Sequence, residues 1–344
     1  MIKPCQFALR WLGVRLLGGL LLLVTFSKIV GAHESQPGVV DITQLDEQRY
    51  QVVWQAPVYY GKPHPAELVL PDSWQVVAPV TTFSTKDANI TTKIVAVDKT
   101  QFNDSVLRFP RLEKTITDVL VRTVLKDGSE FTYIASPTRP SVTLIGERSW
   151  YQAGAEYLAL GIHHILLGID HLLFVLGLML IVKTKLELLK TITSFTLAHS
   201  ITLGLATLGF ASVPLPPLNA TIALSILFLG PEIVKARRGQ TSWTIQYPWI
   251  VAFGFGLLHG FGFASGLTTT GMPKAELPLA LLSFNLGVEI GQIGFVCLAL
   301  AMLWAFKTLR VSWPKWVSWL PGYLVGSLGA YWTIQRTIML GGGF

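Results

Sequence analysis

Three histidines and one aspartate lie close together in an otherwise apolar stretch, residues 161–177. On a helix that turns 100° per residue, His164 and His171 are seven positions apart and share a face. His163 aligns in the same way with Asp170 on the neighbouring face. Each such group at bilayer depth costs roughly 2.5–3.5 kcal/mol, and imidazole nitrogen and carboxylate oxygen are ligands of divalent transition metals. The stretch therefore predicts a metal site inside a membrane helix.

Further ligand-type residues occur in three other apolar segments. Counting 1.5 Å per residue from the expected helix ends places them, with His171, near the middle of the membrane. The predicted metal ligands are His163, His164, Asp170, His171, His199, His259, Asn285 and Glu289. Two alternatives stay open. A single histidine can serve as a hydrogen-bond partner between helices, and a neutral Glu289 can bond to Asn285.

Six membrane helices are expected to position these residues. Each segment is long enough for a hydrocarbon core of about 30 Å; they cover about 156–182, 190–210, 218–235, 246–266, 277–304 and 316–338. Lysines and arginines follow the first, third and fifth segments, and the alternate loops have few. The positive-inside rule then places those three loops in the cytoplasm and the C-terminus outside.

The N-terminal part has a different character. Residues 1–32 resemble a secretory signal peptide, with basic residues, an apolar core and the small residues Val30-Gly31-Ala32 before the cleavage point; an uncleaved anchor is the alternative. Short alternating segments in residues 33–145 predict strands, among them 50–55, 93–97 and 118–125. Lys126-Asp127-Gly128-Ser129 predicts a hairpin turn. The predicted fold class is α+β multidomain: a secreted antiparallel β-sandwich of residues 33–145, then a polytopic six-helix transmembrane domain over 150–344.

Composition agrees with a membrane setting. The chain is 51% hydrophobic and 14% charged, with a mean hydropathy of +0.50, whereas a soluble domain carries about 25% charged residues. The net charge of +7 comes largely from short loops between apolar segments, and no basic stripe with aromatics suggests nucleic-acid binding. Cys5 and Cys297 fall in the signal peptide and a membrane segment, so neither a disulfide nor a thiolate metal site is expected.

The helix motifs resemble the HupE/UreJ family of bacterial membrane proteins. The resemblance rests on His164-x-x-x-Gly168-x-Asp170-His171, with residues 195–203, 256–260 and 284–289 similar to its larger, ectodomain-bearing branch. The family is associated with hydrogenase and urease gene clusters and is regarded as nickel or cobalt permeases. The resemblance therefore implies transport of a divalent ion contacted by His164, Asp170 and His171. Ile165 departs from the proline found in smaller members.

Three functions are compatible with these observations. The first is a permease for a divalent transition metal ion, nickel or cobalt, which is not an enzyme. The second is an intramembrane zinc-dependent hydrolase, with Glu289 or Ser200 assisting. The third is a metal-sensing or assembly protein in which the β-domain binds a periplasmic partner. We expect a multi-pass protein of the bacterial inner membrane with the β-domain outside, where His33 and His64 are further candidate ligands.

Overall fold

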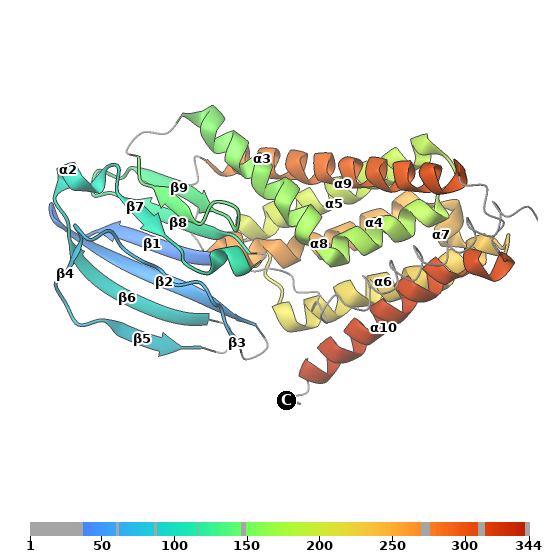
Figure 1. Ribbon diagram of the computed structural model, residues 1–344, viewed down its shortest axis with the longest axis horizontal. Helices are drawn as coiled ribbons and strands as arrows, with labels where there is room; N and C mark the ends of the chain where they lie inside the picture. Colours follow the sequence, from blue (N-terminus) through green and yellow to red (C-terminus); the bar gives the residue numbers. More distant parts are fainter. Residues whose placement is uncertain are drawn as a thin grey trace, which may run out of the picture.

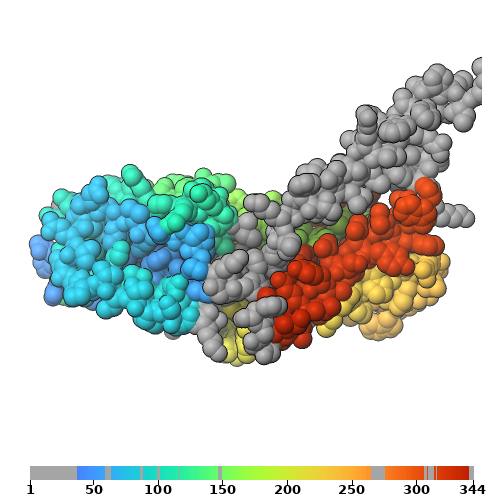
Figure 2. All heavy atoms as spheres, turned by 60° about the horizontal axis from the view of Figure 1, so that its bottom comes forward, coloured from blue at the N-terminus to red at the C-terminus, as the bar shows by residue number. Residues whose placement is uncertain are grey.

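The structure is a computed structural model that describes residues 37–59, 62–85, 88–115, 117–145, 149–269, 276–308 and 314–340. It consists of a β region within residues 37–145 and a helical region within residues 149–340, which lie end to end (Figure 1). A second view shows the same arrangement, with helix α10 (Leu320–Leu340) lying along the helical region (Figure 2). The predicted signal peptide, Cys5 and His33 lie outside the described residues.

The β region is built on one large mixed sheet and a two-stranded sheet. The large sheet has the order β4-β6-β2-β1-β8-β9, with β3 on β2 and β5 on β6, and the small sheet pairs β7 with β10. The strands are β1 Gly38–Gln44, β2 Arg49–Tyr59, β3 Lys62–Pro63, β4 Gln75–Val76, β5 Thr81–Ser84, β6 Ala88–Ala96, β7 Val106–Arg108, β8 Val119–Val124, β9 Glu130–Ala135 and β10 Ser141–Thr143. Two short helices, α2 Lys99–Phe102 and η1 Leu112–Lys114, connect strands.

The expected antiparallel β-sandwich is only partly matched. β1 pairs with β8 in parallel, with Val40 opposite Val121, while the other pairs are antiparallel. Parallel neighbours need a long crossover, and here the chain from Gln44 to Val119 supplies it. The second sheet has two strands among the described residues. An α+β chain with an N-terminal sheet is therefore observed, and a complete sandwich is not confirmed.

Aromatic packing forms the core of the β region. Phe102 of α2 stacks on Tyr50 of β2 at a ring-centroid distance of 4.4 Å, and Trp74 lies 5.6 Å from Phe102. The predicted hairpin is present, since β8 and β9 pair in antiparallel register around a turn in which Gly128 has φ +85°. Side chains from the large sheet, β7, β10, α2 and η1 share one buried cluster, so this region has its own core.

The helical region contains seven longer helices and two short ones among the described residues. They are α3 Trp150–Leu167, α4 Ile169–Ile181, α5 Lys185–Thr207, α6 Leu215–Arg237, α7 Trp243–Gln246, α8 Pro248–Thr269, α9 Leu277–Thr308, η2 Lys315–Ser318 and α10 Leu320–Leu340. The chain runs back and forth along the region (Figure 1). The first expected segment, 156–182, is two helices that meet at Gly168 with a bend of 71°.

Two of the described helices are long and apolar enough to cross a membrane, namely α6 and residues Leu277–Ala305 of α9. The bent pair α3 and α4 adds a third span if it is counted as one, and Pro248–Ala264 of α8 is a shorter apolar helix. The six-span bundle is therefore not confirmed. α5 begins with Lys185, Glu187 and Lys190, and the polar side chains that it turns inward lower its hydropathy further.

Close helix contacts surround the polar residues. Gly260 of α8 packs so tightly on α5 that a Cβ atom there would collide with the Thr202 hydroxyl and the His199 carbonyl. A glycine is therefore needed for α8 to reach this position beside His199.

Candidate metal centre

The break between α3 and α4 brings two histidines together. A straight helix would separate His164 and His171 by about 10 Å along its axis. The 71° bend at Gly168 instead places their ring centroids 4.9 Å apart. A Cβ atom on Gly168 would lie 2.8 Å from both the His171 Nδ1 and the His164 carbonyl oxygen. Gly168 therefore allows the ring of His171 to approach the chain at the break.

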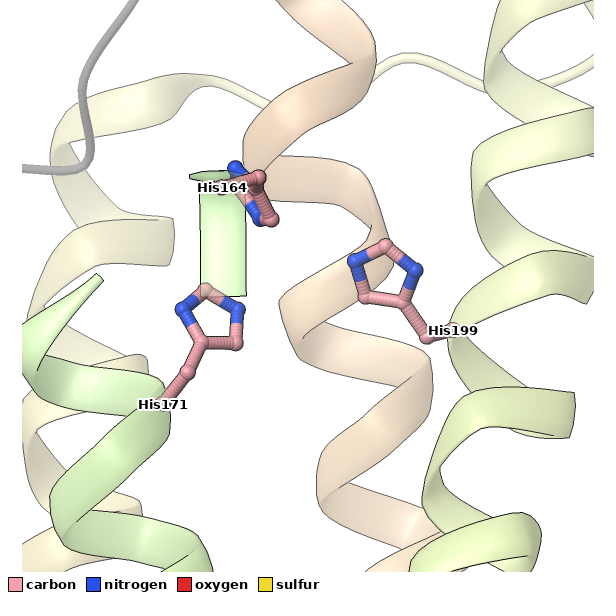
Figure 3. A group of neighbouring side chains, drawn as sticks. All are labelled: His164, His171 and His199. Atoms are coloured by element: carbon pink, nitrogen blue, oxygen red, sulfur yellow. The ribbon is translucent and has the colours of Figure 1, made fainter. Parts of the chain in front are cut away.

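His199 of α5 completes a group of three imidazoles. One ring nitrogen from each of His164, His171 and His199 lies within 4.8 Å of the other two, and all three nitrogens are buried. The rings come from three separate helices and face a common space (Figure 3). Three neutral imidazole nitrogens at this separation are a ligand set for zinc, nickel, cobalt or copper. We call this group the histidine cluster.

A hydrogen bond from Asn285 of α9 orients His199. The Asn285 Nδ2 donates to the Leu281 carbonyl oxygen at 2.8 Å, which leaves its Oδ1 as an acceptor. The His199 Nδ1 lies 3.2 Å from that oxygen and therefore donates to it. The lone pair of His199 is then on Nε2, which is buried and has no hydrogen-bond partner within the described part of the chain. Such a bond on the second ring nitrogen is typical of a metal-binding histidine.

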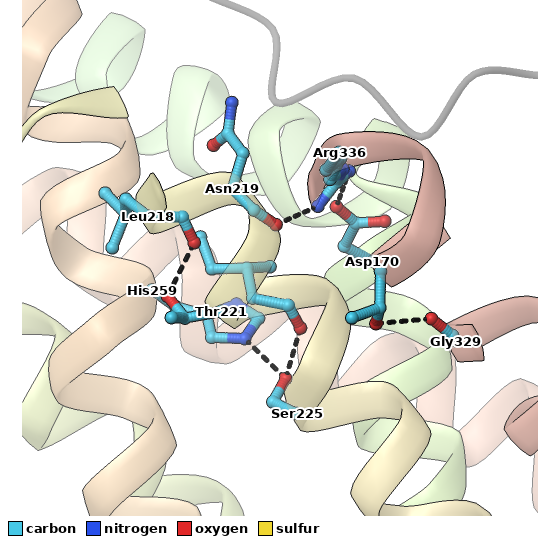
Figure 4. A network of polar contacts seen from close by, with 10 residues as sticks. Asp170, Leu218, Asn219, Thr221, Ser225, His259, Gly329 and Arg336 are labelled. Atoms are coloured by element: carbon cyan, nitrogen blue, oxygen red, sulfur yellow. Dashed lines mark hydrogen bonds and ion pairs between the residues drawn. The ribbon is translucent and has the colours of Figure 1, made fainter. Parts of the chain in front are cut away.

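His259 of α8 is oriented in the same way. The Ser225 hydroxyl of α6 donates to the Ile222 carbonyl oxygen at 2.6 Å, so it accepts from the His259 Nε2 at 3.2 Å (Figure 4). The lone pair of His259 is thus on Nδ1, which is buried without a partner among the described residues. The His259 ring centroid lies 4.7 Å from that of His171, so this residue borders the histidine cluster.

Phenylalanine rings enclose the cluster. Phe263 and Phe284 stack on each other at 4.5 Å and lie 4.5 and 5.4 Å from the His164 ring. Phe195 and Phe174 lie 5.2 and 5.5 Å from the His259 ring. These walls exclude water from the imidazole nitrogens, which strengthens any bond the nitrogens make to a cation.

The structure does not place Asp170 in the histidine cluster. Its Oδ2 forms an ion pair with the Arg336 guanidinium of α10 at 2.7 Å, and both side chains are buried. The Arg336 Nη1 also donates to the Asn219 carbonyl oxygen at 2.7 Å (Figure 4). Asp170 therefore lies one residue from His171 in the chain but faces α6 and α10.

Glu289 and His163 also lie outside the cluster. The Glu289 carboxylate accepts from the Thr193 hydroxyl at 2.7 Å and is half-buried. No bond between Glu289 and Asn285 is present in the described structure, where the Asn285 Oδ1 accepts from His199 instead. His163 is half-buried on α3 and is not among the residues that could share an ion with the cluster. Of the eight predicted ligands, the structure groups His164, His171 and His199, with His259 and Asn285 beside them.

Sequence reasoning missed two residues of this centre. Arg336 is a charged residue within the last expected membrane segment, 316–338, and a charge at that position could have identified it as a functional residue. Ser225 carried no signal, because serines in apolar helices usually bond to their own backbone. Ser200 does so, donating to the Thr196 carbonyl oxygen at 2.7 Å.

His64 of the β region is also buried, but both of its ring nitrogens have hydrogen-bond partners. Its Nε2 lies 2.6 Å from the Thr117 hydroxyl, and its Nδ1 accepts from the Ala66 amide at 3.2 Å. Burial lowers the pKa of His64 to about 4. Both ring nitrogens are engaged within the protein, so in this conformation His64 has no lone pair to offer a metal ion.

Apolar helices around a buried histidine cluster define an integral membrane protein with a centre suited to a metal ion. The family model described as HupE / UreJ protein matches residues 141–336. The match covers more than half of the chain, and the chain belongs to this family, as its motifs indicated. The family is associated with the transport or insertion of nickel or cobalt. No curated protein and no solved structure matches the chain.

Proposed function

We propose that this protein is a permease that carries a divalent transition metal ion, nickel or cobalt, across the bacterial inner membrane. The observation that supports it most is the histidine cluster, where buried imidazole nitrogens from three helices have no partner in the described structure. Leaving buried polar atoms unpaired costs about 1–3 kcal/mol each. A cation bound by these nitrogens would recover that cost, and family membership supports a metal ion as the cargo.

The cluster suits reversible binding. Neutral imidazoles hold a divalent ion without the charge of a carboxylate ligand, so release on the other side stays possible. The break at Gly168 lies at the cluster, and broken helices near the membrane midplane are common at transporter binding sites. A membrane potential, negative inside, would drive the ion inward by roughly 4.6 kcal/mol per 100 mV.

We infer that the β region and the C-terminus lie on the periplasmic side and that residues 33–145 and 150–344 are separate domains. α10 ends at the end of the helical region that faces the β region, whereas α7 lies at the opposite end (Figure 1). Lys235, Arg237 and Arg238 lie just before α7 in the chain, as the positive-inside rule requires of a cytoplasmic end. The β region then stands where it can meet an ion or a periplasmic partner before the membrane.

Transport can be tested with the full chain in proteoliposomes. We expect radiolabelled nickel or cobalt to accumulate with wild-type protein and to fall to the level of empty vesicles with His171→Ala. A matched control is Leu282→Ala, at an α9 side chain that is 71% exposed; it should transport like the wild type. Equal uptake by wild type and His171→Ala would contradict the proposal.

One observation favours the intramembrane zinc hydrolase as a second candidate. The bend makes the three imidazoles compact, and three histidines with an open fourth position are typical of catalytic zinc sites. The two functions differ in how long the metal stays. A zinc ion that survives purification and long dialysis in stoichiometric amount would favour the hydrolase, whereas exchange of added nickel within minutes would favour the permease.

A further inference from the structure

Arg336 is a permanent charge buried in the helical region, with 3% of its surface exposed. Its guanidinium bonds in two directions, to the Asp170 carboxylate and to the Asn219 carbonyl oxygen, each at 2.7 Å. It thereby connects α10 to the start of α4 and the start of α6. A charge at this depth is costly and marks a functional position.

The partner of Arg336 keeps unused ligand capacity. The Asp170 Oδ2 is paired with Arg336, but the Oδ1 is buried without a hydrogen-bond partner in the described structure. Asp170 directly precedes His171 in the first turn of α4. A four-coordinate ion on three imidazoles has one position left, and a carboxylate oxygen is a common fourth ligand. The carboxylate that could fill it is held by a competing cation.

We propose that Arg336 sets the affinity of the histidine cluster for its cargo by competing with the metal ion for Asp170. The inference rests on the proposed function, since it requires an ion to bind at the cluster. While Arg336 holds Asp170, the pair is neutral and the ion meets imidazoles alone. The guanidinium forms charge-assisted bonds in fixed directions, which makes it a strong competitor for the carboxylate. A transported ion therefore binds weakly enough to leave.

A purely structural ion pair makes a different prediction. Removing one partner of a buried pair destabilises the fold whatever the other partner does. Competition adds a second effect, because a carboxylate released from Arg336 becomes available to the ion. The stability of the metal-free protein and its affinity for metal must therefore be measured separately.

The test uses the full chain purified in detergent, titrated with nickel chloride by calorimetry and followed by its melting temperature. We expect Arg336→Gln to melt lower than wild type without metal and to bind nickel at least about tenfold more tightly, the scale at which outer-shell residues affect metal sites. Its melting temperature should then rise more on adding nickel. The double variant Asp170→Asn with Arg336→Gln should lose the gain in affinity. Arg336→Gln that binds nickel no more tightly than wild type would overturn the proposal, as would an unchanged gain in the double variant.

Two further variants make the result specific. Lys235→Gln removes the cation that lies 2.7 Å from Glu232, another buried carboxylate in the helical region. This variant should keep the wild-type affinity for nickel. A gain in affinity comparable to that of Arg336→Gln would overturn the proposal. If Arg336→Gln does not fold, Arg336→Lys replaces it, because lysine keeps the charge without the two-directional geometry of the guanidinium. Arg336→Lys should still bind nickel more tightly than wild type. Unchanged or weaker nickel binding would overturn the proposal. Absence of nickel binding by the wild type itself would instead refute the proposed function.

Discussion

His64 in the β region and His171 in the helical region are both buried, with 7% and 2% of their surfaces exposed. The ring of His64 is held by Thr117 and Ala66, whereas both ring nitrogens of His171 are without partners in the described structure. A protein that needs a histidine for packing satisfies its nitrogens, because each unpaired one costs free energy. The difference supports the proposed role of His171 as a metal ligand and a structural role for His64.

The largest expected effect is the difference between substitutions of these two histidines. His171→Leu should abolish specific nickel binding by the purified protein and leave its melting temperature without metal close to that of wild type, since an apolar side chain of similar size fills the space and the lost ring made no hydrogen bonds within the described structure. His64→Ala should do the opposite: binding is retained, and the β region loses about 1–3 kcal/mol of stability. Titration calorimetry and thermal melting of both variants measure the contrast. Loss of binding in His64→Ala would remove the distinction.

Asp118 differs from His64 although both lie in the β region. The pH dependence of the stability that Asp118 contributes extends the comparison between paired and unpaired buried groups. Burial raises the pKa of Asp118 from 3.8 to about 7, and its Oδ1 has no hydrogen-bond partner among the described residues. The folded state therefore binds the proton more tightly than the unfolded state, and stability is lost as the pH rises from about 4 to about 7. Asp118→Asn should be more stable than wild type by about 2–4 kcal/mol at pH 8.

Hydrogen exchange of the β8 amides measures this effect locally. The stability advantage of Asp118→Asn should shrink as the pH falls and vanish below about pH 4, where Asp118 is protonated in both states. An advantage that does not change with pH would show that the aspartate charge is not its cause.

The orientation of His199 provides a smaller test. Asn285→Leu removes the acceptor that fixes the His199 tautomer, so nickel affinity should fall about 10- to 100-fold, as for other outer-shell partners of metal-bound histidines. Thr202→Val is a matched control on α5, because that hydroxyl bonds to backbone carbonyl oxygens of its own helix. Equal affinities in both variants would mean that Asn285 does not orient the ligand.

Glycine substitutions at two helix positions test the geometry of the break. Gly168→Ala forces a methyl group against the His171 ring, and we expect it to cost about 1–3 kcal/mol of stability and to weaken nickel binding. Gly254→Ala on α8 meets no atom within 4 Å, and it should be neutral or stabilise the helix by up to about 1 kcal/mol. Thermal melting of both proteins measures the difference. A harmless Gly168→Ala would show that close approach at the break is not required.

The sequence indicated which helices carry the polar residues, but not which of their side chains meet. Counting residues along straight helices placed His171, His199, His259 and Glu289 at one depth, because that count uses the rise per residue alone. The structure brings the three histidines together and pairs Glu289 with Thr193. The direction in which a side chain points depends on the neighbouring helices, which a single sequence does not reveal. For that reason Asp170 and Glu289 were expected beside the histidines, whereas the structure pairs them with Arg336 and Thr193.

The fold was predictable to a similar extent. Alternating residues marked β2, β6, β8 and β9, whose register is set by their buried faces. The parallel pairing of β1 with β8 joins segments about eighty residues apart, and local patterns carry no information on such contacts. The bend at Gly168 was missed for another reason. Its backbone, with φ −76° and ψ 89°, suits many residues, and the need for glycine arises from the His171 ring and the His164 carbonyl oxygen.

The phenylalanine walls have a consequence for ion discrimination. Phe263 and Phe284 contact the His164 ring and Phe195 that of His259, so an ion at the cluster has to shed most of its water shell before nitrogen replaces it. Magnesium gives up water reluctantly and prefers oxygen ligands, whereas nickel and cobalt bind imidazole well. The free-energy cost of dehydration would thus favour the binding of a dilute transition metal ion from a solution in which magnesium is far more abundant.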